Sequence, residues 1–250
     1  MMLYDSHCHL ESITANPPYT KLAIVPGCNL LEVPQLVRLR LNHSQYKIGF
    51  GIHPWFINEG MGIDKQLGHL NEAIAEFKPD FIGEIGLDYL KPNHQLQQQL
   101  FKRQLLLALQ LNLPVVIHSV KAYNDVLFIL KECLRATQKV ENSYTAIGRG
   151  IVHGFNSNSI IAKQFTDLGI LLGIGSMVTK KSKLLFNLEQ LPLKYMVFES
   201  DAPFMPGFEK VQSTSSDSFL YAQIVAKQLN VNLIDLICCS NSNVLNLFRK

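Results

Sequence analysis

The chain has 250 residues, of which 47% are hydrophobic and 17% are charged, with a formal net charge of +3. This composition excludes a disordered chain and is typical of a globular protein with enough apolar material for a large core. The weakly basic balance allows a phosphate-bearing partner without requiring one, because Lys and Arg form no block.

Short β-rich apolar runs alternate with longer segments of helical period from one end of the chain to the other. This alternation predicts the βα pattern of a parallel sheet. Strands are expected at residues 2–4, 21–26, 47–52, 80–89, 115–117, 151–152, 170–174 and 195–198. Helices are expected at residues 30–41, 63–77, 94–111, 121–138, 157–168, 181–191, 218–229 and 233–248, with a loop at 140–150.

Eight strands and about eight helices predict an α/β protein with a (β/α)8 TIM barrel. No linker rich in Pro, Gly or Ser divides the chain, so we expect a single domain over residues 1–250. A doubly wound open sheet is the structural alternative.

The first motif is a histidine pair, His7 and His9, at the end of the first expected strand. Residues i and i+2 of a strand point to the same side, so the two imidazoles are expected to converge, as a divalent metal requires. The alternative is one buried polar histidine and one surface histidine, and the pair matters only if the chain supplies partners.

Such partners occur at the carboxyl ends of other expected strands, where a barrel builds its site. Taken singly, each has a structural alternative: an ion-pair partner for Glu84, capping or core groups for the histidines, and a helix N-cap for Asp201. Their common placement favours a nitrogen and carboxylate ligand set for two metals. The expected ligands are His7, His9, Glu84, His118, His153 and Asp201.

Localisation is inferred from absent signals. The five cysteines are scattered without a CxxC pair, which predicts reduced thiols. No secretory leader pattern is present, and no apolar run approaches the roughly 18 residues of a membrane span. We therefore expect a cytoplasmic protein without a membrane partner, and no obligate protein partner is evident.

Six ordered blocks give the chain a family resemblance. It resembles the TatD family of metal-dependent hydrolases, which belong to the amidohydrolase-type barrels. The order and spacing of the blocks cover nearly the whole chain, so the match is specific. The blocks lie at residues 4–10, 51–54, 82–89, 116–118, 152–155 and 199–203.

The resemblance implies a dinuclear centre bridged by Glu84. It places His7, His9 and Asp201 at one metal and His118 and His153 at the other. Asp201 and Glu84 are the expected catalytic residues, with Asp201 orienting a water and taking its proton. Two divalent ions are expected, with zinc, manganese, magnesium, cobalt and iron all compatible with the ligand types.

The activity implied by the resemblance is exonuclease-like hydrolysis of phosphodiester bonds, with DNA or another phosphodiester as the partner. His53 and Lys121 are the expected substrate-binding residues, although His53 could equally fix the loop before Trp55. Trp55 could stack on a base, but packing is the preferred expectation. Asp88 is expected to support the loop rather than to bind metal.

Two departures from the family pattern concern the substrate. The family usually reads His-x-Arg where this chain has His118-Ser119-Val120, and Lys121 is an imperfect replacement for the missing guanidinium. A downstream Asn-x-Pro element is replaced in the region 212–217. Two alternatives therefore stay open: hydrolysis of a small ester or amide, and a metal-binding barrel that has lost turnover through Val120.

Overall fold

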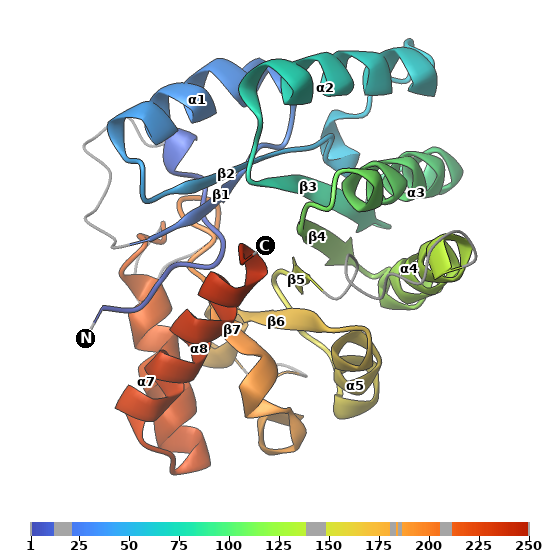
Figure 1. Ribbon diagram of the computed structural model, residues 1–250. Coiled ribbons are helices and arrows are strands. Elements are labelled where there is room, and N and C mark those ends of the chain that lie inside the picture. Colours follow the sequence, from blue (N-terminus) through green and yellow to red (C-terminus); the bar gives the residue numbers. More distant parts are fainter. Residues whose placement is uncertain are drawn as a thin grey trace.

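The computed structural model describes residues 2–12, 22–138, 149–180, 184, 187–205 and 212–249. Its centre is a curled sheet of seven strands that pair in chain order, and every pairing is parallel (Figure 1). The strands are β1 (Ile24–Pro26), β2 (Lys47–Phe50), β3 (Phe81–Asp88), β4 (Val115–Val120), β5 (Gly150–Val152), β6 (Ile170–Ile174) and β7 (Met196–Phe198).

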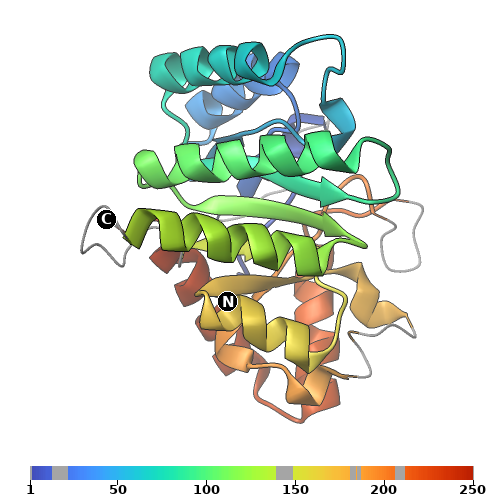
Figure 2. The ribbon, with the colours of Figure 1, turned by 90° about the vertical axis from the view of Figure 1, so that its right-hand side faces the viewer.

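The helices lie outside the sheet, and Figure 2 shows α2 to α5 stacked along one side of the molecule. Asparagine side chains mark two helix starts: Asn158 accepts from the amide of Ile161, and Asn232 accepts from that of Ile234. Within the described part of the chain, no helix combines the length and the apolar character needed to cross a membrane. The helices are α1 (Val33–Asn42), α2 (Ile63–Phe77), α3 (His94–Gln110), α4 (Tyr123–Gln138), α5 (Ser159–Asp167), α7 (Asp217–Leu229) and α8 (Leu233–Leu247).

The parallel α/β fold is confirmed, but the expected strand at residues 2–4 is wrong. This part of the chain forms one isolated bridge, between Asp5 and Ala23. Within residues 2–4 the backbone bonds to a side chain instead of a strand: Tyr4 donates its amide to Asn241 Oδ1, and the carbonyl of Met2 accepts from Asn241 Nδ2. The sheet described by the structure therefore has seven strands rather than eight.

Residues 5–9 nevertheless lie between the two edge strands. On one side, Cys8 donates its amide to the carbonyl of Ile24. On the other, Ser6 donates its amide to the carbonyl of Phe198, 2.9 Å away. This double attachment holds the histidine pair against the ends of β1 and β7.

Two of the predicted segments fall on parts that the structure does not describe. Most of the loop expected at 140–150 lies outside the described residues. So do residues 181–183 and 185–186 of the helix expected at 181–191, whose described end contains the short 3-10 turn Leu188–Gln190.

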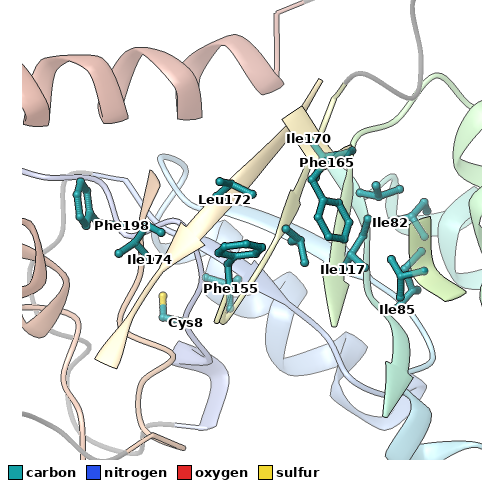
Figure 3. Packing of buried hydrophobic residues seen from close by; sticks show 14 of the residues in the cluster. Cys8, Ile82, Ile85, Ile117, Phe155, Phe165, Ile170, Leu172, Ile174 and Phe198 are labelled. Atoms are coloured by element: carbon teal, nitrogen blue, oxygen red, sulfur yellow. The ribbon is translucent and has the colours of Figure 1, made fainter. Parts of the chain in front are cut away.

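Side chains alternate between two apolar layers along the strands, as a period of two requires. Outward-facing residues such as Ile117 and Leu172 pack with Phe165 of α5 in the large cluster between sheet and helices (Figure 3). Inward-facing residues form a smaller cluster with the end of α8. It comprises Leu22, Ile24, Phe81, Val116, Ile151, Leu171, Val197, Val244 and Leu247. This inner cluster fills the sheet interior on the amino-terminal side of the polar site.

Candidate metal centre

Glu84 lies at the middle of the candidate site, inside β3 and almost fully buried. Close strand packing explains the glycines around it. A side chain at Gly86, whose φ is 151°, would place its Cβ 2.0 Å from the carbonyl oxygen of His118. The glycines thus let β3 and β4 approach while the carboxylate points inward.

One oxygen of Glu84 belongs to a first group of four donors with His7, His9 and Asp201. The Nε2 atoms of His7 and His9 are 3.2 Å apart, and they lie 3.4 and 3.6 Å from Glu84 Oε2. Both also lie 3.5 Å from Asp201 Oδ1. The histidine pair therefore converges as the two-residue spacing predicts, although its segment is not a regular strand.

These separations fit a metal ion. Donors at about 2.0 to 2.1 Å from a tetrahedral ion lie about 3.3 to 3.4 Å from one another. The distances from the two imidazole nitrogens to each other and to the two carboxylate oxygens, 3.2 to 3.6 Å, are close to that value. Two buried imidazoles facing two carboxylates are also the donor types that divalent transition metals prefer. These residues can hold a metal.

The other oxygen of Glu84 faces a second group. His118 Nδ1 is 2.8 Å and His153 Nε2 is 2.9 Å from Glu84 Oε1, and the two nitrogens are 3.0 Å apart. His118 lies inside β4, because this strand extends three residues beyond the expected end at 117. Rings of His7 and His153 stack with centroids 4.0 Å apart, so the two groups adjoin.

Asp88 orients His118. Its Oδ2 lies 3.4 Å from His118 Nε2, on the side of the ring away from Glu84, and accepts a 2.6 Å hydrogen bond from the indole of Trp55. Its Oδ1 accepts from the amide of Leu90. These contacts match the supporting role expected for Asp88, because a carboxylate behind a ligand histidine sets the orientation of its ring.

His53 faces Glu84 but differs from the other histidines in its hydrogen bonds. Its Nδ1 accepts from the backbone amide of Trp55 at 3.1 Å, so the ring proton resides on Nε2. That Nε2 lies 3.2 Å from Glu84 Oε1. A ring nitrogen of His53 lies within 4.8 Å of donor atoms of Glu84 and His118, but a proton on Nε2 leaves that nitrogen without a free lone pair for a metal.

The electrostatics keep both carboxylates ionised. Burial opposes ionisation of Glu84, but the nearby charges of His153 and His53 hold its pKa well below the ordinary value. Burial likewise opposes the charge of Asp201, while hydrogen bonds from His7 and His9 keep its pKa below the usual range. The site therefore presents two negative charges for compensation, one on the buried Glu84 and one on the partly exposed Asp201.

The pKa values of the histidines shift in opposite directions. Burial, helped by the neighbouring charge of His153, lowers the pKa of His7 to about 4. Burial also disfavours the charged form of His153, but the charge of Glu84 outweighs it and raises the pKa of His153 to about 9. The pKa values of His9 and His118 are raised as well, so without a metal His153 is one of several imidazoles that carry compensating protons at neutral pH.

Glu199 is a site residue to which the sequence interpretation gave no role. It directly follows β7, and its Oε1 accepts a 2.5 Å hydrogen bond from the amide of Gly154 and lies 3.8 Å from His153 Nδ1. Burial raises the pKa of Glu199 to about 8. A Cβ at Gly173 would lie 2.1 Å from its Oε2, so that glycine makes room for it. The missed signal was a carboxylate at a strand end.

The expected substrate-binding residues have different positions. His53 belongs to the cluster, whereas Lys121 is exposed after β4 with a left-handed backbone (φ 57°). Trp55 does not pack as expected: its side chain is 56% exposed, and Lys91 Nζ lies 4.3 Å from the centre of its ring. Phe204, 63% exposed, contacts the ring of His9 on another side of the cluster.

Comparisons with known proteins agree with this geometry. The family model described as "TatD related DNase" matches residues 4–249. The uncharacterized metal-dependent hydrolase YjjV of Escherichia coli is 28% identical over 82% of this chain and 82% of its own length. The crystal structure of YjjV superimposes with a TM-score of 0.84, covering 98% of this chain and 97% of that one at 25% identity. A protein of Schizosaccharomyces pombe named deoxyribonuclease Tat-D is 27% identical over 72% of this chain and 59% of its own length.

Proposed function

This chain belongs to the TatD family of metal-dependent hydrolases, and we propose that it hydrolyses phosphodiester bonds in DNA with a dinuclear metal centre. The observation that carries the proposal is the double use of Glu84. Its two oxygens belong to separate donor groups, with His7 and His9 beside one and His118 and His153 beside the other. A shared carboxylate offsets the mutual repulsion of two cations.

In this proposal His7, His9 and Asp201 hold one ion, and His118 and His153 hold the other. When bound, the ions supply Lewis-acid activation of a water and charge stabilisation at the scissile phosphate. Asp201 would accept a proton from that water. Its side chain is 19% exposed against 3% for Glu84, so it is the carboxylate of the first group that solvent reaches.

His53 has a separate task. With its proton on Nε2, it donates a hydrogen bond into the site while Trp55 holds the ring in place. A non-bridging phosphate oxygen or a leaving oxygen is a suitable acceptor. His53 is therefore a substrate-binding residue in this proposal rather than a third histidine ligand of either ion.

Two features support DNA as the substrate class. The relative named deoxyribonuclease Tat-D shares most of this chain's length. In addition, the exposed rings of Trp55 and Phe204 contact His53 and His9 on different sides of Glu84, and exposed aromatic faces are what unpaired bases stack on. Lys91 above Trp55 adds a cation for the phosphate backbone, and Lys121 is a second cation at the end of β4.

The test is hydrolysis of end-labelled single- and double-stranded DNA by the metal-loaded protein, followed by gel electrophoresis. Shortening that requires metal and is lost in Asp201→Asn is the expected result. An aryl phosphodiester and an aryl ester are assayed in parallel. If only the ester is cleaved, the alternative of a small-molecule esterase replaces the proposal. If stoichiometric metal binds and neither substrate is cleaved, the chain is a metal-binding barrel without turnover, a reading that rescue by Val120→Arg would strengthen.

A further inference from the structure

A cysteine lies beside the candidate metal centre and has no role in the proposed reaction. Cys28 follows β1 after Gly27 and is nine-tenths buried. Its Sγ, a ring nitrogen of His9 and a carboxylate oxygen of Glu84 all lie within 4.8 Å of one another. The thiol thus adjoins two of the residues that form the first donor group.

The backbone holds this thiol in place. Glu84 donates its amide to the carbonyl of Gly27 at 2.9 Å, and His53 donates its amide to the carbonyl of Cys28 at 2.9 Å. The amide of Cys28 donates to Glu32 Oε2 at 2.6 Å. Because each bond fixes the turn after β1 to a neighbouring element, the position of Sγ beside Glu84 is built into the fold.

The separation of sulfur and oxygen fits a shared ion. With Cys28 the first group offers five donors, so the ion would be five-coordinate; a sulfur at about 2.3 Å and an oxygen at about 2.1 Å, separated by the 120° of a trigonal bipyramid, lie about 3.8 Å apart. Cys28 Sγ lies 3.8 Å from Glu84 Oε2. This oxygen is the one that faces His7 and His9, so the sulfur is positioned toward the first donor group rather than the second.

We propose that Cys28 is a sulfur ligand at the metal of the first donor group and makes that position selective for thiophilic ions, with zinc the expected occupant. On ligation the S–H bond breaks, a sulfur–metal bond forms and the proton passes to solvent. Thiolate favours zinc and cobalt, whereas magnesium and manganese prefer oxygen donors. The inference rests on the proposed metal centre but concerns which ion it selects.

The test uses cobalt(II) as a spectroscopic probe of the whole chain. Metal-free protein is titrated with cobalt, and the near-ultraviolet sulfur-to-cobalt charge-transfer band is recorded for the wild type, Cys28→Ala, Cys28→Ser and Cys133→Ala. Cys133 is a buried thiol on α4 and serves as the matched control. The band is expected in the wild type and in Cys133→Ala, and absent in both Cys28 variants. Circular dichroism checks that each variant is folded.

Competition with a chromophoric chelator gives the second readout. Even partners behind metal ligands change affinity about 10- to 100-fold, so Cys28→Ser is expected to weaken zinc binding at least 10-fold and to leave manganese binding unchanged. Cobalt binding without the band, or a band that persists in Cys28→Ala, overturns the proposal. DNA hydrolysis is scored separately: if it persists in a wild type that lacks the band, only the sulfur ligand is refuted.

Discussion

On three strands, the inward-facing side chain is apolar at one position and polar at the next inward-facing position, two residues later. An apolar side chain of the inner cluster lies at the amino end of each pair, and a polar group of the candidate metal centre lies at the carboxyl end. The pairs are Val116 and His118, Ile151 and His153, and Val197 and Glu199.

We call the inner apolar cluster the apolar layer and the candidate metal centre the polar layer. The two differ in what their burial requires. The apolar layer needs only close packing, so its contribution is to stability. The polar layer places charges and ring nitrogens where water is excluded, which is unfavourable unless they compensate one another or a cation. Substitutions in the two layers should therefore separate stability from metal-dependent function.

The largest expected effect is at Glu84. Glu84→Gln removes the charge shared by both donor groups, and since metal ions contribute several kcal/mol of charge stabilisation, hydrolysis should fall by about 10³-fold or more. Bound metal per chain should fall with it. Activity and elemental analysis provide the measurement, with Glu76→Gln on the exposed side of α2 as control. Full activity in Glu84→Gln would show that hydrolysis does not need the charge shared by the two donor groups.

Two substitutions at the end of β5, at Ile151 and at His153, compare the two layers most directly. Ile151→Ala should lower the free energy of unfolding by about 2 to 5 kcal/mol, the usual effect of such a cavity. Metal content per folded chain should stay unchanged. Chemical denaturation and elemental analysis test this. Loss of bound metal from folded Ile151→Ala would contradict the separation of stability from metal binding.

His153→Gln is the matching change two residues later. It keeps a hydrogen-bonding group but lacks the imidazole, so hydrolysis should fall by about 10²-fold or more, as when one stabilising group is removed from a reaction centre. The free energy of unfolding of chelator-treated protein should change by only about 1 kcal/mol. A loss of stability as large as that of Ile151→Ala would contradict the comparison.

A smaller effect is expected at Glu199, which lies behind His153 in the polar layer. Glu199→Gln should weaken metal binding at the second donor group about 10- to 100-fold, because partners behind ligand histidines tune their orientation and basicity. Isothermal titration with zinc measures it, and Glu189→Gln on the surface is the control. Unchanged affinity would make Glu199 a purely structural carboxylate.

Trp55, at the exposed edge of the candidate metal centre, should show the smallest effect. Trp55→Ala should weaken single-stranded DNA binding by about 1 to 3 kcal/mol, the value of one stacked base. Cleavage of an aryl phosphodiester should be less affected. Trp55→Phe keeps an aromatic face without the hydrogen bond to Asp88, so it distinguishes stacking from loop support. Equal losses for DNA and the small substrate would favour loop support.

The strand-end rule explains what could be predicted from the sequence. It brought together Glu84, His118 and His153, since parallel strands end at one edge and the apolar run before each residue is easy to recognise. The same rule applied to Glu199, but its neighbour Asp201 took the metal-ligand role in the family pattern. Whether a carboxylate faces the metal or the back of a histidine depends on side-chain direction, which one sequence does not contain.

Other features depended on contacts between distant segments. The missing strand at 2–4 follows from the bonds between Asn241 and the backbone of Met2 and Tyr4, which are far from it in the chain. Trp55 was expected to pack, but its hydrogen bond to Asp88 holds it at the surface. Cys28 also follows a strand, yet a lone thiol carries no motif until the fold places Glu84 beside it.

The proposed function depends on Glu84 lying between two metal ions. A crystal structure of zinc-loaded protein, with anomalous scattering recorded at the zinc edge, tests this position. Two peaks per chain are expected, one beside His7, His9 and Asp201 and one beside His118 and His153, with one Glu84 oxygen toward each. A single peak, or two peaks that do not share Glu84, would contradict it.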